Sequence, residues 1–237
     1  MEHLREELDS LLAQLPNERE VRDRLESLVS VYPFNEYEFI ISTLLAGNVL
    51  TLEGYHELRD SYIARSPYRP LFTLSPTPFG ITWAEKHLQE LVSKLEKPMR
   101  GERGYDLLLG GIRVEVKASR AVDKESKKTL VEKALMWGSP RPFVMNFQQT
   151  KPKHFDVIVW VGVWLDRICY WALSASEIQG LRRFSKGQHR GNVGEGQLHV
   201  KHDNIHEFEK YEAEPNKLEE AIRAACDRES KAKSKSG

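Results

Sequence analysis

The chain has 237 residues, with 35 acidic and 35 basic side chains, so it is long enough to bury a sizeable core in one large domain, or in one domain with an appendage. No apolar run approaches the length of a membrane span, and the N-terminal residues lack the basic start and apolar centre of a signal peptide, so we expect a cytoplasmic protein. The two cysteines, Cys169 and Cys226, indicate neither a disulfide framework nor a zinc motif.

The net charge of zero hides a division along the chain. Residues 1–60 contain thirteen acidic and five basic residues and sum to −8, so the remainder sums to +8. A basic region is typical of a surface that binds phosphates, whereas an acidic region is repelled by a duplex. The distribution favours nucleic-acid binding by the part that follows residue 60.

The N-terminal part predicts an array of helices. The helical segments are residues 3–14, 18–31, 35–46 and a segment capped by Thr51 that runs to about Ala64. The break at Gly47-Asn48 is compatible with a helix-turn-helix, but the helix after it is close to neutral and those before it are acidic. We therefore expect residues 1–76 to form a helical subdomain for dimerisation or scaffolding.

A further amphipathic helix is predicted from a Thr82 cap through Lys97. One stripe of this helix would carry Trp83, His87, Leu88, Leu91, Val92 and Leu95. Glu85 falls in its first turn, where a solvated glutamate favoured by the helix dipole is the ordinary interpretation.

Residues 105–117, YDLLLGGIRVEVK, predict a tight hairpin, because Gly110-Gly111 supplies the positive φ of a two-residue turn between two apolar runs. Counting outward from the turn pairs Leu109 with Ile112, Leu108 with Arg113, Leu107 with Val114 and Asp106 with Glu115. Opposed residues share a face and side chains alternate along a strand. Asp106, Glu115 and Lys117 should therefore lie together on one face.

Two opposed carboxylates repel each other unless a cation neutralises them. Mg²⁺ suits such a site, since it takes carboxylate oxygens together with waters and phosphate oxygens. The ion would activate a water and stabilise charge on a scissile phosphate, while Lys117 would orient the attacking water or stabilise the transition state. An exposed hairpin face with an ordinary Glu–Lys pair is the alternative interpretation.

Asp106 followed by Glu115-Val116-Lys117 resembles the signature of the PD-(D/E)xK nuclease superfamily, which includes many type II restriction endonucleases. Tyr105 stands where the signature has proline, a position that binds no metal. The resemblance covers roughly residues 80 to 180. It implies a restriction endonuclease-like α/β core, a mixed central β-sheet flanked by helices, with Mg²⁺ held by Asp106 and Glu115. It also makes Glu85 and Gln149 catalytic candidates, because the family often carries an acidic residue and a glutamine or lysine at the matching places; for Gln149 a polar loop is the alternative.

The downstream pattern has the order expected of such a core. Residues 155–164, FDVIVWVGVW, form an apolar run that predicts a strand buried on both faces. A turn at Asp166-Arg167 precedes a second predicted strand, Ile168–Leu173, and Ser174 begins a predicted helix. We expect the nuclease core to occupy residues 77–216.

Residues 181–200 are predicted to form a DNA-contact loop, since arginine and lysine suit guanine edges, glutamine and asparagine suit adenine, and glycines permit close approach to a groove. A flexible basic loop, or phosphate contact without specificity, is the alternative. Residues 217–237 are expected to be a helical to disordered basic tail. The residues predicted to contact DNA are Arg100, Arg103, Arg120, Lys151, Lys153, Arg182, Arg183, Lys186, Gln188, His189, Arg190 and Asn192.

Together these patterns predict a type II restriction enzyme that hydrolyses double-stranded DNA with Mg²⁺ and leaves a 5′-phosphate and a 3′-hydroxyl. The resemblance further implies a homodimer and a cognate DNA methyltransferase encoded nearby. A structure-specific repair or junction-resolving nuclease is one alternative, and a non-catalytic DNA-binding protein on a nuclease fold is another.

Overall fold

The computed structural model describes residues 8–23, 36–99, 104–187 and 193–234. The chain divides into two compact units, Met1–Pro67 and Tyr68–Gly237. The division lies before the boundary that we expected after residue 76. Its position follows from Phe72, which is buried in the apolar core of the second unit.

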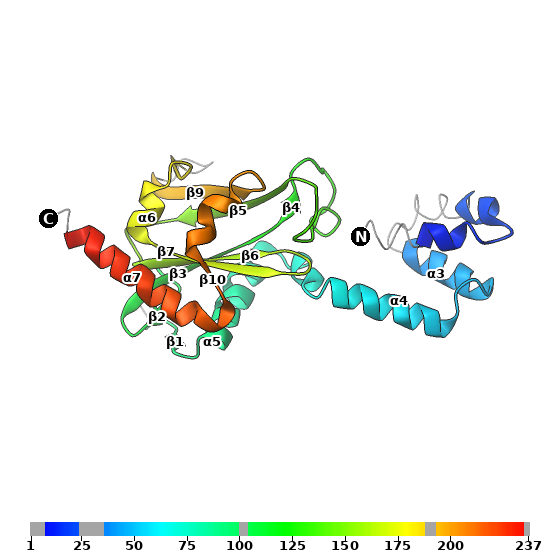
Figure 1. Cartoon of the computed structure of the whole chain (residues 1–237), viewed down its shortest axis with the longest axis horizontal. Helices are drawn as coiled ribbons and strands as arrows, with labels where there is room; N and C mark the ends of the chain where they lie inside the picture. Colours follow the sequence, from blue (N-terminus) through cyan, green and yellow to red (C-terminus); the bar gives the residue numbers. More distant parts are fainter. Residues whose placement is uncertain (1–7, 24–35, 100–103, 188–192, 235–237) are drawn as a thin grey trace. The chain divides into compact units, whose positions relative to one another are not determined.

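The first unit is helical throughout its regular parts (Figure 1). Its described helices are residues 8–12, residues 18–23, α3 (Glu36–Ala46) and α4 (Leu52–Arg65). The predicted cap of α4 is confirmed, since Thr51 Oγ1 accepts a hydrogen bond of 3.0 Å from the Gly54 amide. A separate core holds this unit together and consists of Leu8, Leu12, Leu15, Val21, Ile40, Leu44 and Leu50.

The second unit combines strands and helices. Its strands are β1 (Leu95–Glu96), β2 (Leu107–Leu109), β3 (Ile112–Arg120), β4 (Val122–Asp123), β5 (Phe143–Thr150), β6 (Val157–Val163), β7 (Ile168–Ser174), β8 (Ser185–Gly187), β9 (Val193–Lys201) and β10 (Glu212–Ala213). Its helices are η2 (Arg69–Phe72), η3 (Pro78–Ala84), α5 (Glu85–Leu91), α6 (Ala175–Gly180), η4 (Ile205–Tyr211), η5 (Pro215–Lys217) and α7 (Leu218–Ser234).

The strands form two sheets. A six-stranded sheet has the order β1-β2-β3-β6-β7-β10, in which β3 and β6 are parallel and the other neighbours are antiparallel. The second sheet is antiparallel, with the order β4-β5-β9-β8. The fold is therefore a mixed α/β structure with a mostly antiparallel mixed sheet flanked by helices.

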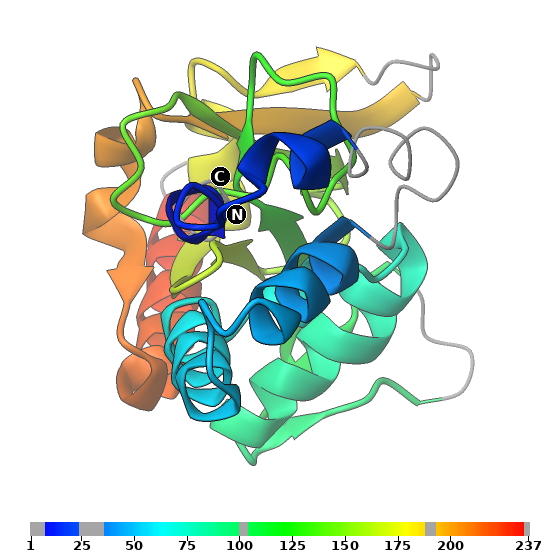
Figure 2. The same ribbon diagram turned by 90° about the vertical axis from the view of Figure 1, so that its right-hand side faces the viewer.

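Each face of the six-stranded sheet is covered by different elements. Alternate residues of β3 and β6, including Val116 and Val159, pack with apolar residues of η3, α5 and α7. The opposite face, which includes Ile158 and Trp160, packs against the four-stranded sheet, α6 and η4. Figures 1 and 2 show α5 below the six-stranded sheet and β9 above it. The β3–β6 pair consequently lies in the middle layer of the unit.

Several predicted elements are confirmed. β6 is buried at every position and pairs antiparallel with β7, as its continuous apolar run indicated. Ser174 caps α6 with a capping box: its hydroxyl accepts a hydrogen bond from the Glu177 amide, and the Glu177 carboxylate accepts one from the Ser174 amide. Within the described residues, no helix is both long and apolar enough to span a membrane.

Three predictions differ from the structure. The helix expected from Thr82 to Lys97 begins earlier, at Pro78 in π-helical form, and ends at Leu91, because Leu95 pairs with Leu109 as part of β1. The loop expected at residues 181–200 contains strands β8 and β9. Residues 217–237 were expected to be a helical to disordered basic tail; they include the helix α7, which differs from that expectation in burying Leu218, Ile222, Ala225 and Glu229.

Candidate active site

The hairpin at residues 105–117 has the predicted register. Leu107, Leu108 and Leu109 pair with Val114, Arg113 and Ile112, and Gly110 and Gly111 both have positive φ. The fourth predicted pair, Asp106 with Glu115, is not a strand pair. Instead the Asp106 amide donates to the Val114 carbonyl at 3.0 Å, and Asp106 Oδ2 accepts from the Val116 amide at 2.8 Å. The short aspartate side chain thus replaces a backbone carbonyl at the end of the ladder.

Asp106 and Glu115 nevertheless meet through their side chains. Their carboxyl groups are hydrogen-bonded, and the Lys117 ammonium lies 2.5 Å from Glu115 Oε1. Glu115 and Lys117 are two residues apart on β3 and share a face, as predicted. The three proposed catalytic residues therefore form one cluster, with Asp106 half-buried and Glu115 almost fully buried.

Burial and a neighbouring carboxylate act on Glu115 in the same direction. Desolvation above all, with a contribution from Asp106, raises its pKa to about 7, against the opposing effect of Lys117. Burial also disfavours the charged form of Lys117, but attraction to Glu115 and Asp106 outweighs burial, and the pKa of Lys117 is raised. Near neutral pH the cluster therefore holds a cationic lysine beside a glutamate close to its titration midpoint.

Glu85 lies beside this cluster at the junction of η3 and α5. Its carboxylate pairs with Lys97, which follows β1. Its pKa is raised, first by burial and then also by Asp106, while Lys97 and Lys117 lower it. Only 6% of Glu85 is exposed, so it is not the solvated first-turn glutamate of the ordinary interpretation.

An aromatic column fixes the helix that carries Glu85. The rings of Phe79, Trp83 and His87 stack at centroid distances of 5.1 Å, and His87 Nε2 lies 2.6 Å from the Tyr170 hydroxyl on β7. Burial lowers the pKa of His87, which favours its neutral ring at pH 7. The column anchors η3 and α5 against the sheet and so directs Glu85 toward the hairpin.

The donor set of this cluster consists of hard carboxylate oxygens. Asp106 and Glu115 converge most closely, and Glu85 is close enough for its pKa to respond to Asp106. Across the described ranges, no group of three His, Cys, Asp or Glu side chains has the arrangement of a metal site. A two-carboxylate site of this kind fits a cation that keeps water or substrate ligands, such as Mg²⁺.

Other predicted site residues lie elsewhere. Gln149 is exposed at an irregularity of β5, where its φ is +56°, and among the described residues no hydrogen bond joins its side chain to the cluster. Arg120 is buried: its guanidinium donates to the Leu71 and Leu74 carbonyls at 2.8 and 2.6 Å and stacks over the Phe79 ring. Burial lowers the pKa of Arg120 to about 10. Its guanidinium is thus engaged inside the unit, not presented to DNA as we expected.

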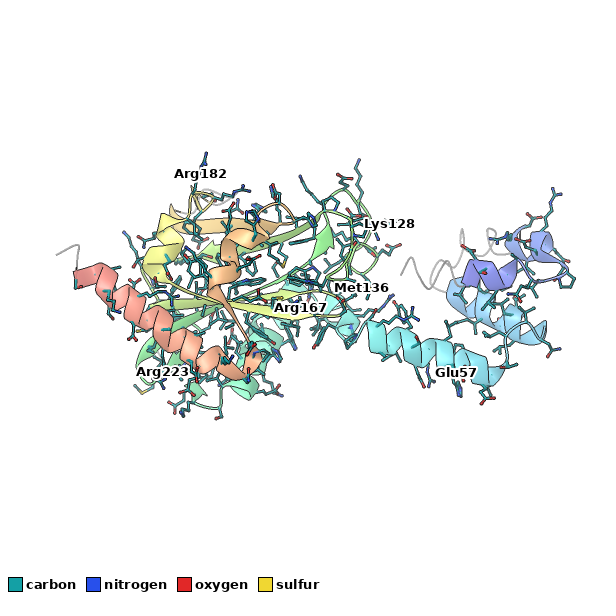
Figure 3. The ribbon with its side chains drawn as sticks, viewed as in Figure 1. Glu57, Lys128, Met136, Arg167, Arg182 and Arg223 are labelled. Carbon is teal, nitrogen blue, oxygen red and sulfur yellow. The ribbon has the colours of Figure 1, made fainter. Side chains whose placement is uncertain are left out.

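The remaining predicted DNA contacts fall in three groups. Lys151 pairs with Glu195 at 2.8 Å, and Arg183 pairs with Glu207 at 3.3 Å. Lys153 and Arg182 are exposed, and Arg182 projects outward from the segment after α6 (Figure 3). Lys186 belongs to β8. The other predicted contacts lie outside the described residues or have side chains that are not described; they are Arg100, Arg103, Lys186, Gln188, His189, Arg190 and Asn192.

Two features of the site had no clear signal in the sequence. Lys97 was assigned to the end of a helix, and only the pairing of β1 with β2 brings it to Glu85. Asp156 precedes β6, and its carboxylate accepts hydrogen bonds from the Arg113 amide and guanidinium at 2.9 to 3.1 Å. It therefore fastens the start of β3, two residues before Glu115.

No protein-family model matches this sequence, and no curated protein matches it. One solved structure with partial similarity is titled as the structure of a bacterial homing endonuclease, I-Ssp6803I. The identity is 14% and the TM-score is 0.37, over 67% of this chain and 99% of that one. A TM-score this low does not assign a fold to this chain.

Proposed function

We propose that the protein is a Mg²⁺-dependent DNA endonuclease. The observation that supports this function is the convergence of Asp106, just before β2, with Glu115 and Lys117 of β3 in one hairpin, with Glu85 beside them. An ordinary exposed Glu–Lys pair would be solvated, whereas here Glu115 is 6% exposed. A carboxylate pair with one member almost fully buried beside a lysine is costly for folding and is characteristic of functional sites.

In this proposal Asp106 and Glu115 hold the cation. When bound, Mg²⁺ would lower the pKa of a water and stabilise negative charge on the scissile phosphate. Glu115 must lose its proton to act as a ligand, so its raised pKa makes proton and cation compete for the same oxygens. Lys117 donates hydrogen bonds toward the attacking water or the phosphate, and the Glu85–Lys97 pair borders the site.

More specifically, we propose that the protein is a type II restriction enzyme that cleaves double-stranded DNA at a fixed sequence and leaves a 5′-phosphate and a 3′-hydroxyl. It would act as a homodimer, with a cognate methyltransferase encoded nearby. Digestion of a long DNA of known sequence in Mg²⁺ should give discrete fragments. Cleavage confined to branched DNA would instead indicate a junction-resolving nuclease, and binding without cleavage would indicate a non-catalytic protein.

Asp106→Asn and Lys117→Ala should each lower the cleavage rate by on the order of 10³-fold or more while DNA binding survives, since each removes a charge from the site. Asparagine keeps an oxygen that can accept the hydrogen bond from the Val116 amide. Asp106→Asn therefore removes the negative charge and leaves the geometry of the hairpin unchanged. The rates should be measured in single turnover on a supercoiled plasmid.

Lys128→Ala is the matched control, because Lys128 is exposed and carries the same charge away from the cluster. This variant should cleave at the wild-type rate. Wild-type cleavage by Asp106→Asn or Lys117→Ala would exclude the proposed site.

A further inference from the structure

A cavity of about 540 Å³ opens beside the hairpin, where the loop before β6, the start of α6 and the end of α7 meet. Its charged lining comes from Arg113, Lys153, Glu229 and Lys233. Three of these four side chains are cationic. All of them lie in the second unit.

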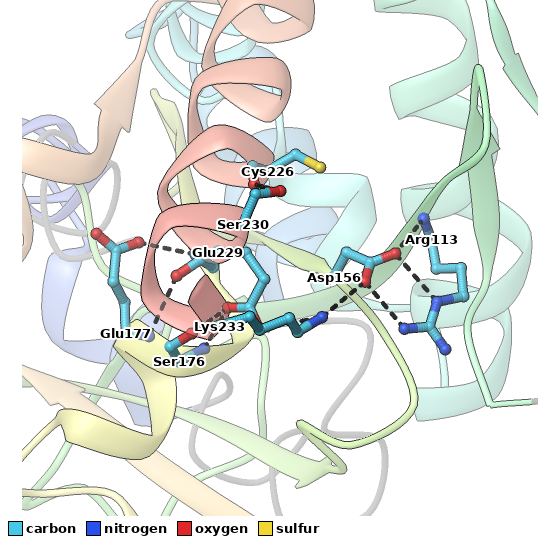
Figure 4. Close-up of polar contacts among 9 residues, drawn as sticks. Arg113, Asp156, Ser176, Glu177, Cys226, Glu229, Ser230 and Lys233 are labelled. Atoms are coloured by element: carbon cyan, nitrogen blue, oxygen red, sulfur yellow. Dashed lines mark hydrogen bonds and ion pairs between the residues drawn. The ribbon is translucent and has the colours of Figure 1, made fainter. Parts of the chain in front are cut away.

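The anionic groups around the cavity are already hydrogen-bonded (Figure 4). Asp156 accepts from the Arg113 amide and guanidinium, and Glu229 accepts from both the amide and the hydroxyl of Ser176. The pKa of Asp156 is lowered to about 2, chiefly by its hydrogen bond from Arg113. Both carboxylates are therefore charged and fixed at neutral pH.

The two lysines are held less tightly. Lys233 lies 3.4 Å from Asp156 and 3.4 Å from Glu229, at the long end of ion-pair distances, and its side chain is 59% exposed. Lys153 is exposed and makes no ion pair among the described residues. Arg113, Lys153 and Lys233 together exceed Asp156 and Glu229 by one positive charge, and this excess resides on side chains that can turn toward a ligand.

The cavity is next to the candidate active site. Arg113 precedes Glu115 by two residues on the same face of β3, a separation of roughly 7 Å along the strand. The loop that carries Lys153 also packs on the chain just before Asp106: a Cβ atom at Gly104 would lie 2.5 Å from His154 Nδ1. A nucleic-acid strand with one phosphate at Asp106 and Glu115 would therefore bring another phosphate to the cavity.

We propose that this cavity binds a backbone phosphate that flanks the cleaved one, through Lys153 and Lys233 with Arg113 behind them. The proposal rests on the proposed nuclease function and names a phosphate subsite for it. Arg113 stays fixed by Asp156, so it supplies positive potential without a change of rotamer. On binding, both lysines replace bound water by phosphate oxygens, and Lys233 also gives up its weak ion pairs.

The test uses the full-length protein and a DNA duplex in metal-free buffer with chelator, so that binding is measured without cleavage. Lys153→Ala and Lys233→Ala should each reduce the slope of log K against log salt concentration by about 0.9, and the double variant by about twice that amount. Lys231→Ala is the matched control, since Lys231 is an exposed neighbour on α7 outside the cavity lining. Its slope should stay at the wild-type value.

Inorganic phosphate is the second probe. Titration followed by NMR of the lysine ammonium and arginine guanidinium groups should shift Lys233 and Arg113, and duplex DNA should displace the phosphate. A different outcome is that phosphate binds, duplex DNA does not displace it, and the DNA affinity of the variants keeps the wild-type salt dependence. In that case the cavity serves a free phosphate compound, and the DNA subsite is excluded. Absence of phosphate binding, or a Lys231→Ala effect equal to the others, also excludes it. Mg²⁺-dependent cleavage is measured separately, so the nuclease function can survive either result.

Discussion

Glu115 is subject to two opposing requirements at the level of a single residue. Burial and the nearby Asp106 carboxyl disfavour its charge, yet its proposed role as a cation ligand requires the charged form. Lys117 offsets part of this penalty at 2.5 Å. The cluster therefore stores an electrostatic cost in the metal-free protein, which a divalent ion would relieve.

That cost should make stability depend on pH. The pKa of Glu115 is about 7 in the folded protein and 4.5 as its ordinary value, so between these values the folded state holds a proton that the unfolded state has lost. Stability consequently falls as pH rises from 4.5 to 7. In metal-free buffer, the wild type should lose up to about 3 kcal/mol relative to Glu115→Gln between pH 5 and pH 8.

Denaturant unfolding monitored by tryptophan fluorescence measures this difference, since Trp160, Trp164 and Trp171 are buried in the unit that contains Glu115. Asp106, Lys117 and Glu85 face Glu115 and remain in both proteins. Parallel pH profiles for wild type and Glu115→Gln would show that Glu115 has an ordinary pKa. Glu209→Gln, at an exposed glutamate of the same unit, serves as the control and should follow the wild type.

At the level of elements, the junction of β3 and β6 positions the strand that carries Glu115 and Lys117. These strands are parallel, so no tight turn can join them, and side-chain contacts at one end add to the backbone ladder that aligns them. Asp156 supplies such contacts, since it binds Arg113 through its carboxylate and through its amide, which donates to the Arg113 carbonyl at 2.9 Å. The same carboxylate reaches Lys233 on α7.

Replacing Asp156 should therefore destabilise the second unit. Asp156→Ala removes the partner of a half-buried guanidinium and of the Arg113 amide, which should lower the free energy of unfolding by about 2 to 3 kcal/mol. Asp227→Ala, at an exposed aspartate on α7, should change it by less than about 0.5 kcal/mol. Equal stability of the two variants in urea titrations would show that Asp156 does not fasten β3.

Local signals explain which elements were predictable. The Gly110-Gly111 turn and the alternation of side chains fixed three hairpin pairs, and the continuous apolar run identified β6. Asp106 left the ladder because its side chain competes for a backbone amide, which alternation does not encode. Lys97 and Arg120 were misjudged for a different reason: their partners, Glu85 and the carbonyl of Leu71, are brought to them by tertiary packing alone.

At the scale of the whole molecule, charge and structure divide at nearly the same place. Residues 1–67 contain thirteen acidic and six basic residues, so the first unit carries a charge of −7 and the second +7. The candidate active site and the proposed phosphate cavity both belong to the positive unit. From this division we predict that phosphate binding belongs to the second unit and that the first has a dimerisation or scaffolding role.

The separate cores predict separate effects of core mutations. Leu44 lies in the core of the first unit and Leu88 in that of the second, and neither has measurable exposure. All five tryptophans belong to the second unit, so their fluorescence reports on that unit. Leu88→Ala should lower the tryptophan-monitored free energy of unfolding by about 2 to 5 kcal/mol. Leu44→Ala should leave that transition unchanged and instead accelerate amide hydrogen exchange in residues 8–23 and 36–50. A tryptophan transition shifted equally by both variants would mean that the two cores unfold as one cooperative structure.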